Sequence, residues 1–395
     1  MAIMDVILLV IAALVAVPFI VLAIEAFASL VPLRRLPPAA AERARCVILM
    51  PAHDEEVGIA AAIANVREQL APGDCALVVA DNCTDRTATV ARAAGVEVAE
   101  RIDPDRRGKG FALDFGLEQL SANPPPVVVV VDADCQLGPG ALDVLVRQAA
   151  ATGRPAQGVY RIGTGDEPDT RRRLSAFAVL LKNHIRPLGL HQLGLPCLLY
   201  GTGMAFPWNV IRSVNVGTGN IVEDTRLGVD LAFAGYPARL CPAATLSGAA
   251  APDRRAAIKQ RTRWEHGHVQ TLITQSPKLL LTGLLRARPR LMGLGLELAI
   301  PPLSLLFVTW MIVQVICLVW WQWAGGSWAP AVTLGGALVL AGIGVFLAWV
   351  RFGRTMLPFS SLLTAPAYVL WKIPIYVKLV TSREKRWVRT ERGGL

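Results

Sequence analysis

The amino-acid sequence predicts an α/β domain built on a parallel sheet and flanked by membrane-spanning helices. Two observations support this fold class. Between about residues 43 and 275, short apolar runs alternate with helical patterns, which is typical of a parallel, right-handed α/β sheet. Hydrophobic residues make up 53% of the 395-residue chain, and the mean hydropathy is +0.44. This apolar share is higher than in ordinary globular domains and therefore indicates membrane segments.

The chain begins with an apolar segment, from about residue 6 to residue 31, which we expect to be a retained anchor within residues 1–33. It is too long for a signal peptide, and no Lys or Arg precedes it. Arg34 and Arg35 follow and place its C-terminal end in the cytoplasm, because basic residues stay on that side. This orientation predicts an integral protein of the cytoplasmic membrane whose α/β domain is cytosolic.

Two more spans are predicted within residues 294–350. The first ends in a group of tryptophans between residues 320 and 323, which is typical of a membrane interface, and a Gly-Gly-Ser turn follows it. Pro301 and Pro302 should delay or kink its start. Each span is long enough to cross roughly 30 Å of hydrocarbon.

Three other stretches combine apolar and basic residues. We expect residues 276–293 to form an interfacial helix, because a Leu-rich face alternates with arginines. Residues 356–380 contain three prolines, and the basic tail at 381–395 should stay cytosolic, which favours an interfacial or re-entrant helix over a fourth span. Residues 173–199 fit either a membrane-surface helix or an ordinary core-facing helix.

The net charge of +10 points to membrane lipids and not to nucleic acid as a partner. The basic residues cluster beside the apolar segments, where they attract anionic lipid. The seven cysteines are scattered without a CxxC pair, which fits a reducing cytosol and argues against disulfides and a zinc site.

Polar residues follow the predicted strands where each one ends, and ligands bind beyond the carboxyl ends of parallel strands. After the strand at residues 127–131 come Asp132 and Asp134, one residue apart, so that both side chains point to the same side of the chain. Carboxylate oxygens suit a hard cation that also binds phosphate oxygens, namely Mn²⁺ or Mg²⁺. The sequence therefore predicts a metal site for a phosphate-bearing ligand.

Six motifs follow one another between residues 46 and 268: Pro51-Ala52-His53-Asp54-Glu55, Ala80-Asp81-Asn82-Cys83-Thr84-Asp85, Gly108-Lys109-Gly110, Asp132-Ala133-Asp134, Glu223-Asp224 and Gln260-x-x-Arg263-Trp264. In this order they resemble the membrane-bound family-2 glycosyltransferases, which include cellulose, chitin and hyaluronan synthases and ceramide glucosyltransferase-like enzymes. The resemblance implies a Rossmann-like GT-A fold, a nucleotide-sugar donor that is usually UDP-linked, and inverting transfer.

The resemblance also implies how the donor binds. Asp134 would hold the divalent metal, and Asp132 would sit beside it, toward the ribose or diphosphate. Asp81 matches the residue that contacts the base, although the family often has two adjacent acids there and this chain has Ala80-Asp81. Pro51, His53 and Glu55 would line the same pocket. Glu55 is the better candidate for a base or ribose contact, and His53 fits a solvated loop equally well.

Basic residues for the diphosphate come from two helices. Lys109 lies between two glycines at a helix start, where an anion is favoured, although a turn with a solvated lysine is the alternative. Gln260, Arg263 and Trp264 are spaced i, i+3 and i+4 and so share one helix face. Arg263 would bind the diphosphate through its guanidinium, Gln260 would contact the donor, and Trp264 would stack on the acceptor sugar.

Glu223-Asp224 matches the family's Thr-Glu-Asp motif, with Val222 in place of the Thr. The resemblance assigns Asp224 as the general base that takes the proton of the acceptor hydroxyl, and Glu223 as a residue that orients the site. Residues Gly201, Thr202 and Gly203 resemble the acceptor-side loop, with a simple glycine turn as the alternative.

We therefore expect a glycosyltransferase that adds a sugar to a lipid or lipid-linked saccharide. The alternative is a processive polysaccharide synthase, which would need export partners because about three spans are too few to line a closed channel. A non-catalytic scaffold is disfavoured, since Asp134, Asp224 and Arg263 are all present. The membrane spans and the Gln-x-x-Arg-Trp motif disfavour a soluble nucleotidyltransferase.

Overall fold

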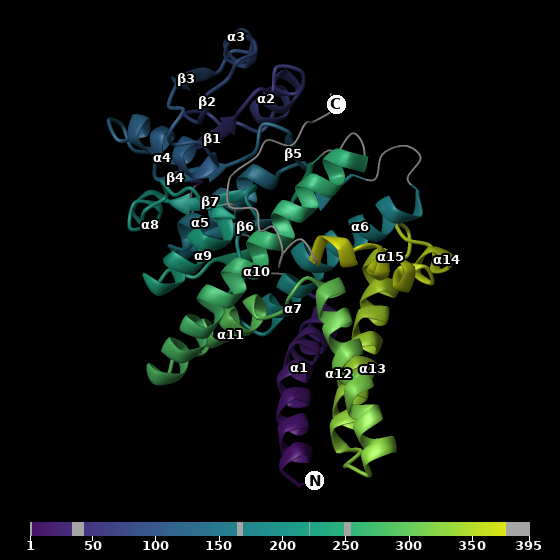
Figure 1. Cartoon of the computed structure of the whole chain (residues 1–395). Helices are drawn as coiled ribbons and strands as arrows, with labels where there is room; N and C mark the ends of the chain where they lie inside the picture. The colour runs from purple at the N-terminus through teal and green to yellow at the C-terminus, as the bar shows by residue number, and fades with distance from the viewer. Residues whose placement is uncertain (1, 34–42, 164–168, 221, 249–253, 377–395) are drawn as a thin grey trace. The chain divides into compact units, whose positions relative to one another are not determined.

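The computed structural model divides the chain into two compact units, each described by itself (Figure 1). The sheet unit comprises residues 34–167, 195–267 and 385–395, and the helical unit comprises residues 1–33, 168–194 and 268–384. The structure describes residues 2–33, 43–163, 169–220, 222–248 and 254–376. The basic tail predicted at residues 381–395 lies outside the described residues.

An eight-stranded sheet forms the centre of the sheet unit, in the order β3-β2-β1-β4-β7-β6-β8-β5. The strands are β1 (Cys46–Ala52), β2 (Cys75–Asp81), β3 (Glu97–Arg101), β4 (Val127–Val130), β5 (Cys135–Leu137), β6 (Ala156–Ile162), β7 (Met204–Pro207) and β8 (Arg239–Gly248). The strands β3, β2, β1 and β4 are parallel, as predicted. The other half is mixed, because β7 runs antiparallel to β4 and β6, and β5 runs antiparallel to β8. A short apolar run such as β7 does not encode strand direction, so this half could not be predicted.

Helices cover both faces of this sheet. The helices α2 (Ile59–Arg67), α3 (Thr87–Ala93) and α5 (Ala141–Thr152) contribute to the core on one face. On the other face lie α4 (Lys109–Leu120), α8 (Trp208–Ile211) and α9 (Glu223–Phe233). The alternation along β4 divides its side chains between the two cores, with Val127 and Val129 in the first and Val128 and Val130 in the second. Both faces of the strand are therefore buried, which explains its unbroken run of valines.

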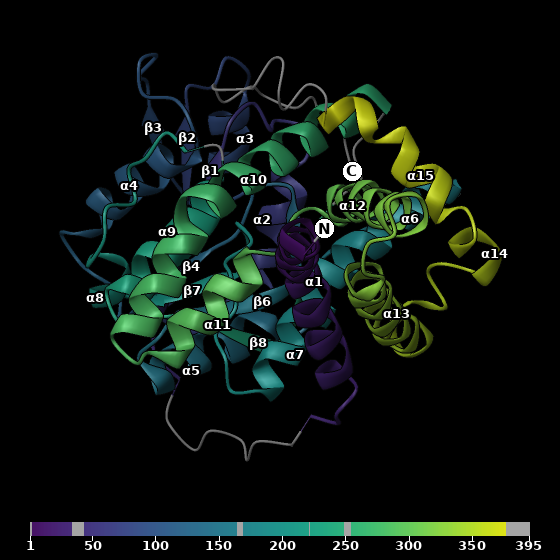
Figure 2. The same cartoon turned by 60° about the horizontal axis from the view of Figure 1, so that its bottom comes forward.

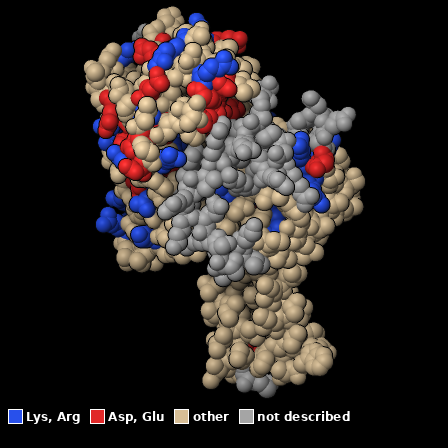
Figure 3. Space-filling model, turned by 45° about the horizontal axis from the view of Figure 1, so that its top comes forward, with Lys and Arg blue, Asp and Glu red and all other residues tan. Residues whose placement is uncertain are grey.

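Three helices of the helical unit are long and apolar enough to cross a membrane: α1 (Ala2–Ser29), α12 (Leu303–Ala324), and α13 (Ala329–Ala348) with the π-helical turn Trp349–Gly353 that extends it. Charged side chains are almost absent from this bundle in the lower part of Figure 3. The second span begins at Leu303 and not at residue 294, because Pro301 and Pro302 separate it from the preceding helix.

Shorter helices complete the helical unit. They are α6 (Thr170–Leu180), the π-helix Leu181–Ile185, α7 (Arg186–Gln192), α11 (Pro289–Leu298), α14 (Phe359–Leu362) and α15 (Ala365–Trp371). A further helix, α10 (Arg254–Leu285), begins in the sheet unit and ends in the helical unit. The expected single helix at 276–293 is in fact the end of α10, a turn at Ala287 (φ 49°) and the start of α11. Within the described part of residues 356–380, α14 and α15 are too short to span a bilayer.

A buried ionic cluster joins three helices of the helical unit. The Arg186 guanidinium donates to the Glu25 carboxylate at 2.8 Å and lies 2.9 Å from the Glu297 carboxylate. Its Nη2 also donates to the backbone oxygen of Glu297 at 3.0 Å. All three side chains are at most 6% exposed. The cluster therefore ties α1, α7 and α11 together and cannot lose its cation without leaving buried carboxylates uncompensated.

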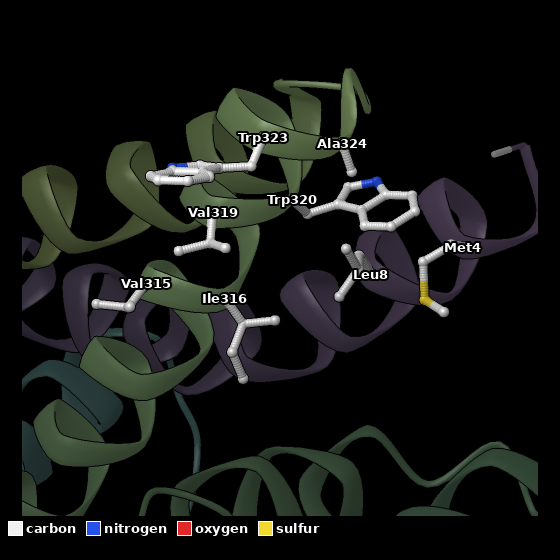
Figure 4. A pocket seen from close by; sticks show the side chains of 8 residues that line it. All are labelled: Met4, Leu8, Val315, Ile316, Val319, Trp320, Trp323 and Ala324. Atoms are coloured by element: carbon white, nitrogen blue, oxygen red, sulfur yellow. The ribbon is translucent and has the colours of Figure 1, made fainter.

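Side chains of α1 and α12 line an apolar hollow of about 410 Å³ (Figure 4). Leu8 of α1 faces Ile316 and Trp320 of α12 across it. The Trp320 indole N–H donates to the Asp5 carboxylate at 2.8 Å, which fixes the ring at the rim. The lining is hydrocarbon, as expected of a surface between membrane-spanning helices.

Candidate active site

Lys109 and Asp132 lie at the carboxyl edge of the sheet, where the sequence places the diphosphate and the metal. Lys109 is the first residue of α4, and its ammonium pairs with the Asp132 carboxylate and donates to the backbone oxygen of Gly201 at 2.6 Å. The backbone N–H of Asp132 donates to the Thr202 hydroxyl at 3.1 Å. The alternative of a solvated lysine in a turn is therefore wrong, because the Lys109 side chain is only 17% exposed.

Asp132, Asp134 and Cys135 offer ligand atoms that all lie within 4.8 Å of one another. Two carboxylates are a suitable donor pair for Mn²⁺ or Mg²⁺, which bind oxygen ligands. The Cys135 thiol lies 3.6 Å from the Asp134 carboxylate. The structure thus brings together Asp132 and Asp134, the two residues at which the sequence predicts a divalent-cation site.

Glu223 and Asp224 form the first turn of α9 and reach the same cluster. Asp224 accepts a hydrogen bond from the backbone N–H of Thr225 at 2.6 Å. A Cβ atom added to Gly201 would lie 3.2 Å from the Asp224 carboxylate and 3.4 Å from the Lys109 ammonium. Gly201 also has a φ of +88°, so both the backbone conformation and the space require glycine there. Asp224, Gly201 and Lys109 are therefore immediate neighbours.

The charges of this cluster act on one another. Burial and the charge of Asp224 raise the pKa of Glu223 to about 7. Burial alone would lower the pKa of Lys109, but the carboxylates of Asp132, Glu223 and Asp224 outweigh it and raise that pKa above its ordinary value. Lys109 therefore stays charged, and the Glu223–Asp224 pair holds a proton that it releases near neutral pH.

The helix α10 meets the start of α9. A Cβ atom added to Gly267 would lie 2.7 Å from Cγ1 of Val222, the residue before Glu223. Gly267 follows Arg263 by four residues and Trp264 by three, so all three share a helix face with Gln260. At Gly267 the predicted face of α10 therefore packs against the residue that precedes Glu223. Val222, which replaces the expected Thr, forms the contact with this helix.

Asp81 ends β2 in a buried ionic arrangement. Its carboxylate accepts hydrogen bonds from Arg101 at 2.7 Å and from the Asn82 side chain at 2.9 Å, and Arg101 also binds Asp103 at 2.7 Å. Burial raises the pKa of Asp81 even though Arg101 opposes the shift. His53 lies beside this group, since its Nδ1 is 2.7 Å from the Asp81 backbone oxygen. The structure thus brings His53 and Asp81 together at one end of the predicted donor pocket.

Other residues of the first motif hold the loops in place. The Asp54 carboxylate accepts the backbone N–H of Thr84 at 2.6 Å, and the backbone N–H of Glu55 donates to the Thr87 hydroxyl at 2.7 Å. Pro51 lies within β1 itself. Asp54 therefore joins the loops after β1 and β2. The sequence could not distinguish this role of Asp54 from that of a solvated carboxylate.

Two structural supports of the site were not predicted. Gln157, fully buried in β6, donates to the backbone oxygen of Thr202 at 2.9 Å and accepts from the backbone N–H of Tyr200 at 2.9 Å. It thereby fixes the loop that carries Gly201 and Gly203. Arg101, the last residue of β3, is the second support, through its bond to the Asp81 carboxylate. Gln157 is the second residue of β6, whose first four residues are buried, and an amide among such neighbours was the available signal.

Comparison with known proteins identifies the fold and the relatives. The Glycosyl transferase family 2 model matches residues 47–215. Uncharacterized glycosyltransferases of Mycobacterium tuberculosis and Mycobacterium bovis are each 35% identical to this chain over 187 residues, covering 42% of this chain and 81% of their own length. The structure of a mannosyltransferase from Pyrobaculum calidifontis, in complex with GDP-Man and Mn²⁺, is 21% identical, with a TM-score of 0.59 over 95% of this chain and 100% of that one. These similarities confirm the GT-A fold.

Proposed function

This chain belongs to glycosyl transferase family 2, and we propose that it transfers a sugar from a nucleotide sugar to a lipid or lipid-linked saccharide. The observation that supports this most strongly is the position of Lys109. Its ammonium pairs with Asp132 and donates to Gly201, and Gly201 in turn adjoins the Asp224 carboxylate. A cation for the diphosphate, a metal-binding carboxylate and a general base then lie around one point. Such an arrangement serves transfer of a glycosyl group between two oxygens.

In the proposed reaction, Asp224 accepts the proton of the acceptor hydroxyl as that oxygen attacks the anomeric carbon. The bond from the anomeric carbon to the diphosphate breaks on the opposite face, so the configuration inverts. Lys109 and Arg263 bind the phosphate oxygens and stabilise the negative charge of the leaving group. Asp134 and Asp132 would hold a divalent cation, which would supply Lewis-acid stabilisation of that same charge. Glu223 shares a proton with Asp224 near neutral pH and thereby sets the pH at which the base becomes free.

The donor pocket we propose includes Asp81, His53 and Glu55 for the base and ribose, with Gln260 on the diphosphate side. Arg101 occupies one side of the Asp81 carboxylate, which holds that group in a fixed orientation. A fixed carboxylate accepts an N–H of a nucleobase, as a uracil or a guanine both offer. UDP-linked sugars are the first donors to test, and GDP-linked sugars are the second.

The acceptor side is proposed to include Gly201, Thr202, Gly203 and Trp264. Thr202 is 2% exposed and positions Asp132, so its contribution is indirect. A lipid acceptor is supported by the three helices of the described chain that are long and apolar enough to cross a membrane. With basic residues retained inside, the α/β domain would then work at the cytoplasmic face of the cytoplasmic membrane.

The test is transfer by the full chain in nanodiscs with Mn²⁺, a membrane lipid extract and a panel of radiolabelled UDP- and GDP-sugars. Label that enters the organic phase as one discrete species, and does not in an Asp224→Asn variant, is the expected result. Label in a large insoluble product would instead establish the alternative, a processive polysaccharide synthase that needs export partners. Absence of transfer with every donor would contradict both functions.

A further inference from the structure

The ends of α10 and α11 form a hairpin whose charge is unusually one-sided. Between residues 268 and 298 the basic side chains are Lys278, Arg286, Arg288 and Arg290, and the single acidic residue is Glu297. Glu297 is buried against Arg186, whereas all four basic residues are exposed. Among the described residues, no ion pair includes any of the four. Within the described part of the chain, the hairpin therefore presents four exposed cations that form no ion pair.

The two helices are packed tightly against each other (Figures 1 and 2). A Cβ atom added to Gly283 would lie 2.6 Å from Cγ and 2.8 Å from the backbone nitrogen of Met292. The Ser276 hydroxyl donates to the backbone oxygen of Gly295 at 2.8 Å, and Leu279 between them is fully buried. The inner face is thus filled, so side chains on the outer face cannot turn inward.

Large apolar side chains occupy that outer face. Ile273 is 62%, Leu281 58%, Leu284 66% and Leu285 75% exposed. Their spacings of eight, three and one residues place them along one side of α10. A group of exposed leucines beside exposed arginines is costly in water and marks a binding surface.

We propose that this hairpin docks onto an anionic phospholipid bilayer, with its leucines in the boundary between headgroups and acyl chains and its four cations on the lipid phosphates. Apolar side chains next to clustered Lys and Arg are what such a surface attracts. An acidic protein would match the cations but would leave the four exposed apolar side chains unexplained. The candidate span α12 starts five residues after α11 ends, which keeps the hairpin close to a bilayer. The inference rests on the proposed membrane embedding and adds the lipid class.

Docking can be measured without any sugar donor. The full chain with Leu284→Cys, labelled with an environment-sensitive fluorophore, is placed in nanodiscs of phosphatidylcholine with or without phosphatidylglycerol. We expect blue-shifted emission only with the anionic lipid, and a return toward the aqueous emission as salt is raised. Labelled parent chain gives the background from the seven native cysteines. A label at Val57, which is 73% exposed in the sheet unit, should not respond.

Variants that remove the arginine charges distinguish docking on anionic lipid from membrane contact that does not depend on charge. Arg286→Gln with Arg288→Gln and Arg290→Gln should weaken docking about fivefold per arginine, or about a hundredfold together. The matched control replaces three exposed arginines of the sheet unit, Arg67, Arg92 and Arg212, with Gln and should leave docking unchanged. Equal emission in both lipids, or an unchanged hairpin signal in the triple variant, would overturn the proposal. The inactive Asp224→Asn chain should dock normally, so failure of the enzymatic function would be seen separately.

Discussion

Replacing Lys109 with Met removes the cation at the centre of the carboxylate cluster. Lys109 pairs with Asp132 and acts electrostatically on Glu223 and Asp224. An opposite charge at such range lowers a carboxyl pKa by about 1–3 units, and a partly solvated pocket favours the lower end. Loss of Lys109 should therefore raise the pKa of the Glu223–Asp224 pair by about one unit, equivalent to about 1.4 kcal/mol.

The assay is the pH dependence of kcat/KM for sugar transfer. In the parent enzyme, activity should fall below about pH 7, because the Glu223–Asp224 pair then holds a proton and accepts the proton of the acceptor hydroxyl less readily. In Lys109→Met this acid limb should move about one unit upward. Lys109→Arg keeps the charge and should move it little. Glu223→Gln removes the like charge beside Asp224 and should move the limb downward.

The shift of the acid limb along the pH axis, and not the size of kcat/KM, tests whether Lys109 acts on the base. A lower kcat/KM alone would also follow from weaker donor binding, since Lys109 is placed at the diphosphate. An acid limb at the same pH in Lys109→Met and in the parent would refute the electrostatic coupling of Lys109 to the base.

Three further predictions follow from contacts in the two units. Asp134→Ala should abolish transfer and weaken Mn²⁺ binding, measured by electron paramagnetic resonance, whereas Asp224→Asn should abolish transfer with Mn²⁺ binding intact; turnover near the parent rate in either variant would exclude its assigned role. Gly267→Ala should lower transfer at least tenfold, because its Cβ would press on Val222, and Val222→Ala in the same chain should restore activity. No rescue by the second change would show that the contact does not transmit the defect. Arg186→Met should destabilise the helical unit by about 3–5 kcal/mol, because two buried glutamates lose their cation. A melting temperature equal to the parent's in detergent would contradict this.

The sequence predicted the parallel half of the sheet well, because three of its four strands, β1, β2 and β4, are apolar runs that end in or precede polar residues. The antiparallel strands could not be predicted, since nothing in Met204–Pro207 indicates the direction in which the strand runs. The start of the second span was misplaced for a similar reason. Residues 294–298 are apolar enough to continue a span. The sequence predicted that Pro301 and Pro302 would delay or kink its start, and the structure shows that they separate α11, which ends at Leu298, from α12, which begins at Leu303.

In the candidate site too, some residues could be predicted from the sequence and others could not. Asp132, Asp134, Lys109 and Asp224 belong to local motifs and could be named from the sequence. Their supports are long-range and could not: the Gln157 amide reaches a loop 45 residues away.

The measurement that tests the central claim most directly is the anomeric configuration of the transferred sugar, determined by NMR on the purified product. A single displacement with Asp224 as the base predicts a configuration opposite to that in the nucleotide sugar. A retained configuration would require two displacements or a different geometry of attack, and it would contradict the mechanism proposed for this site.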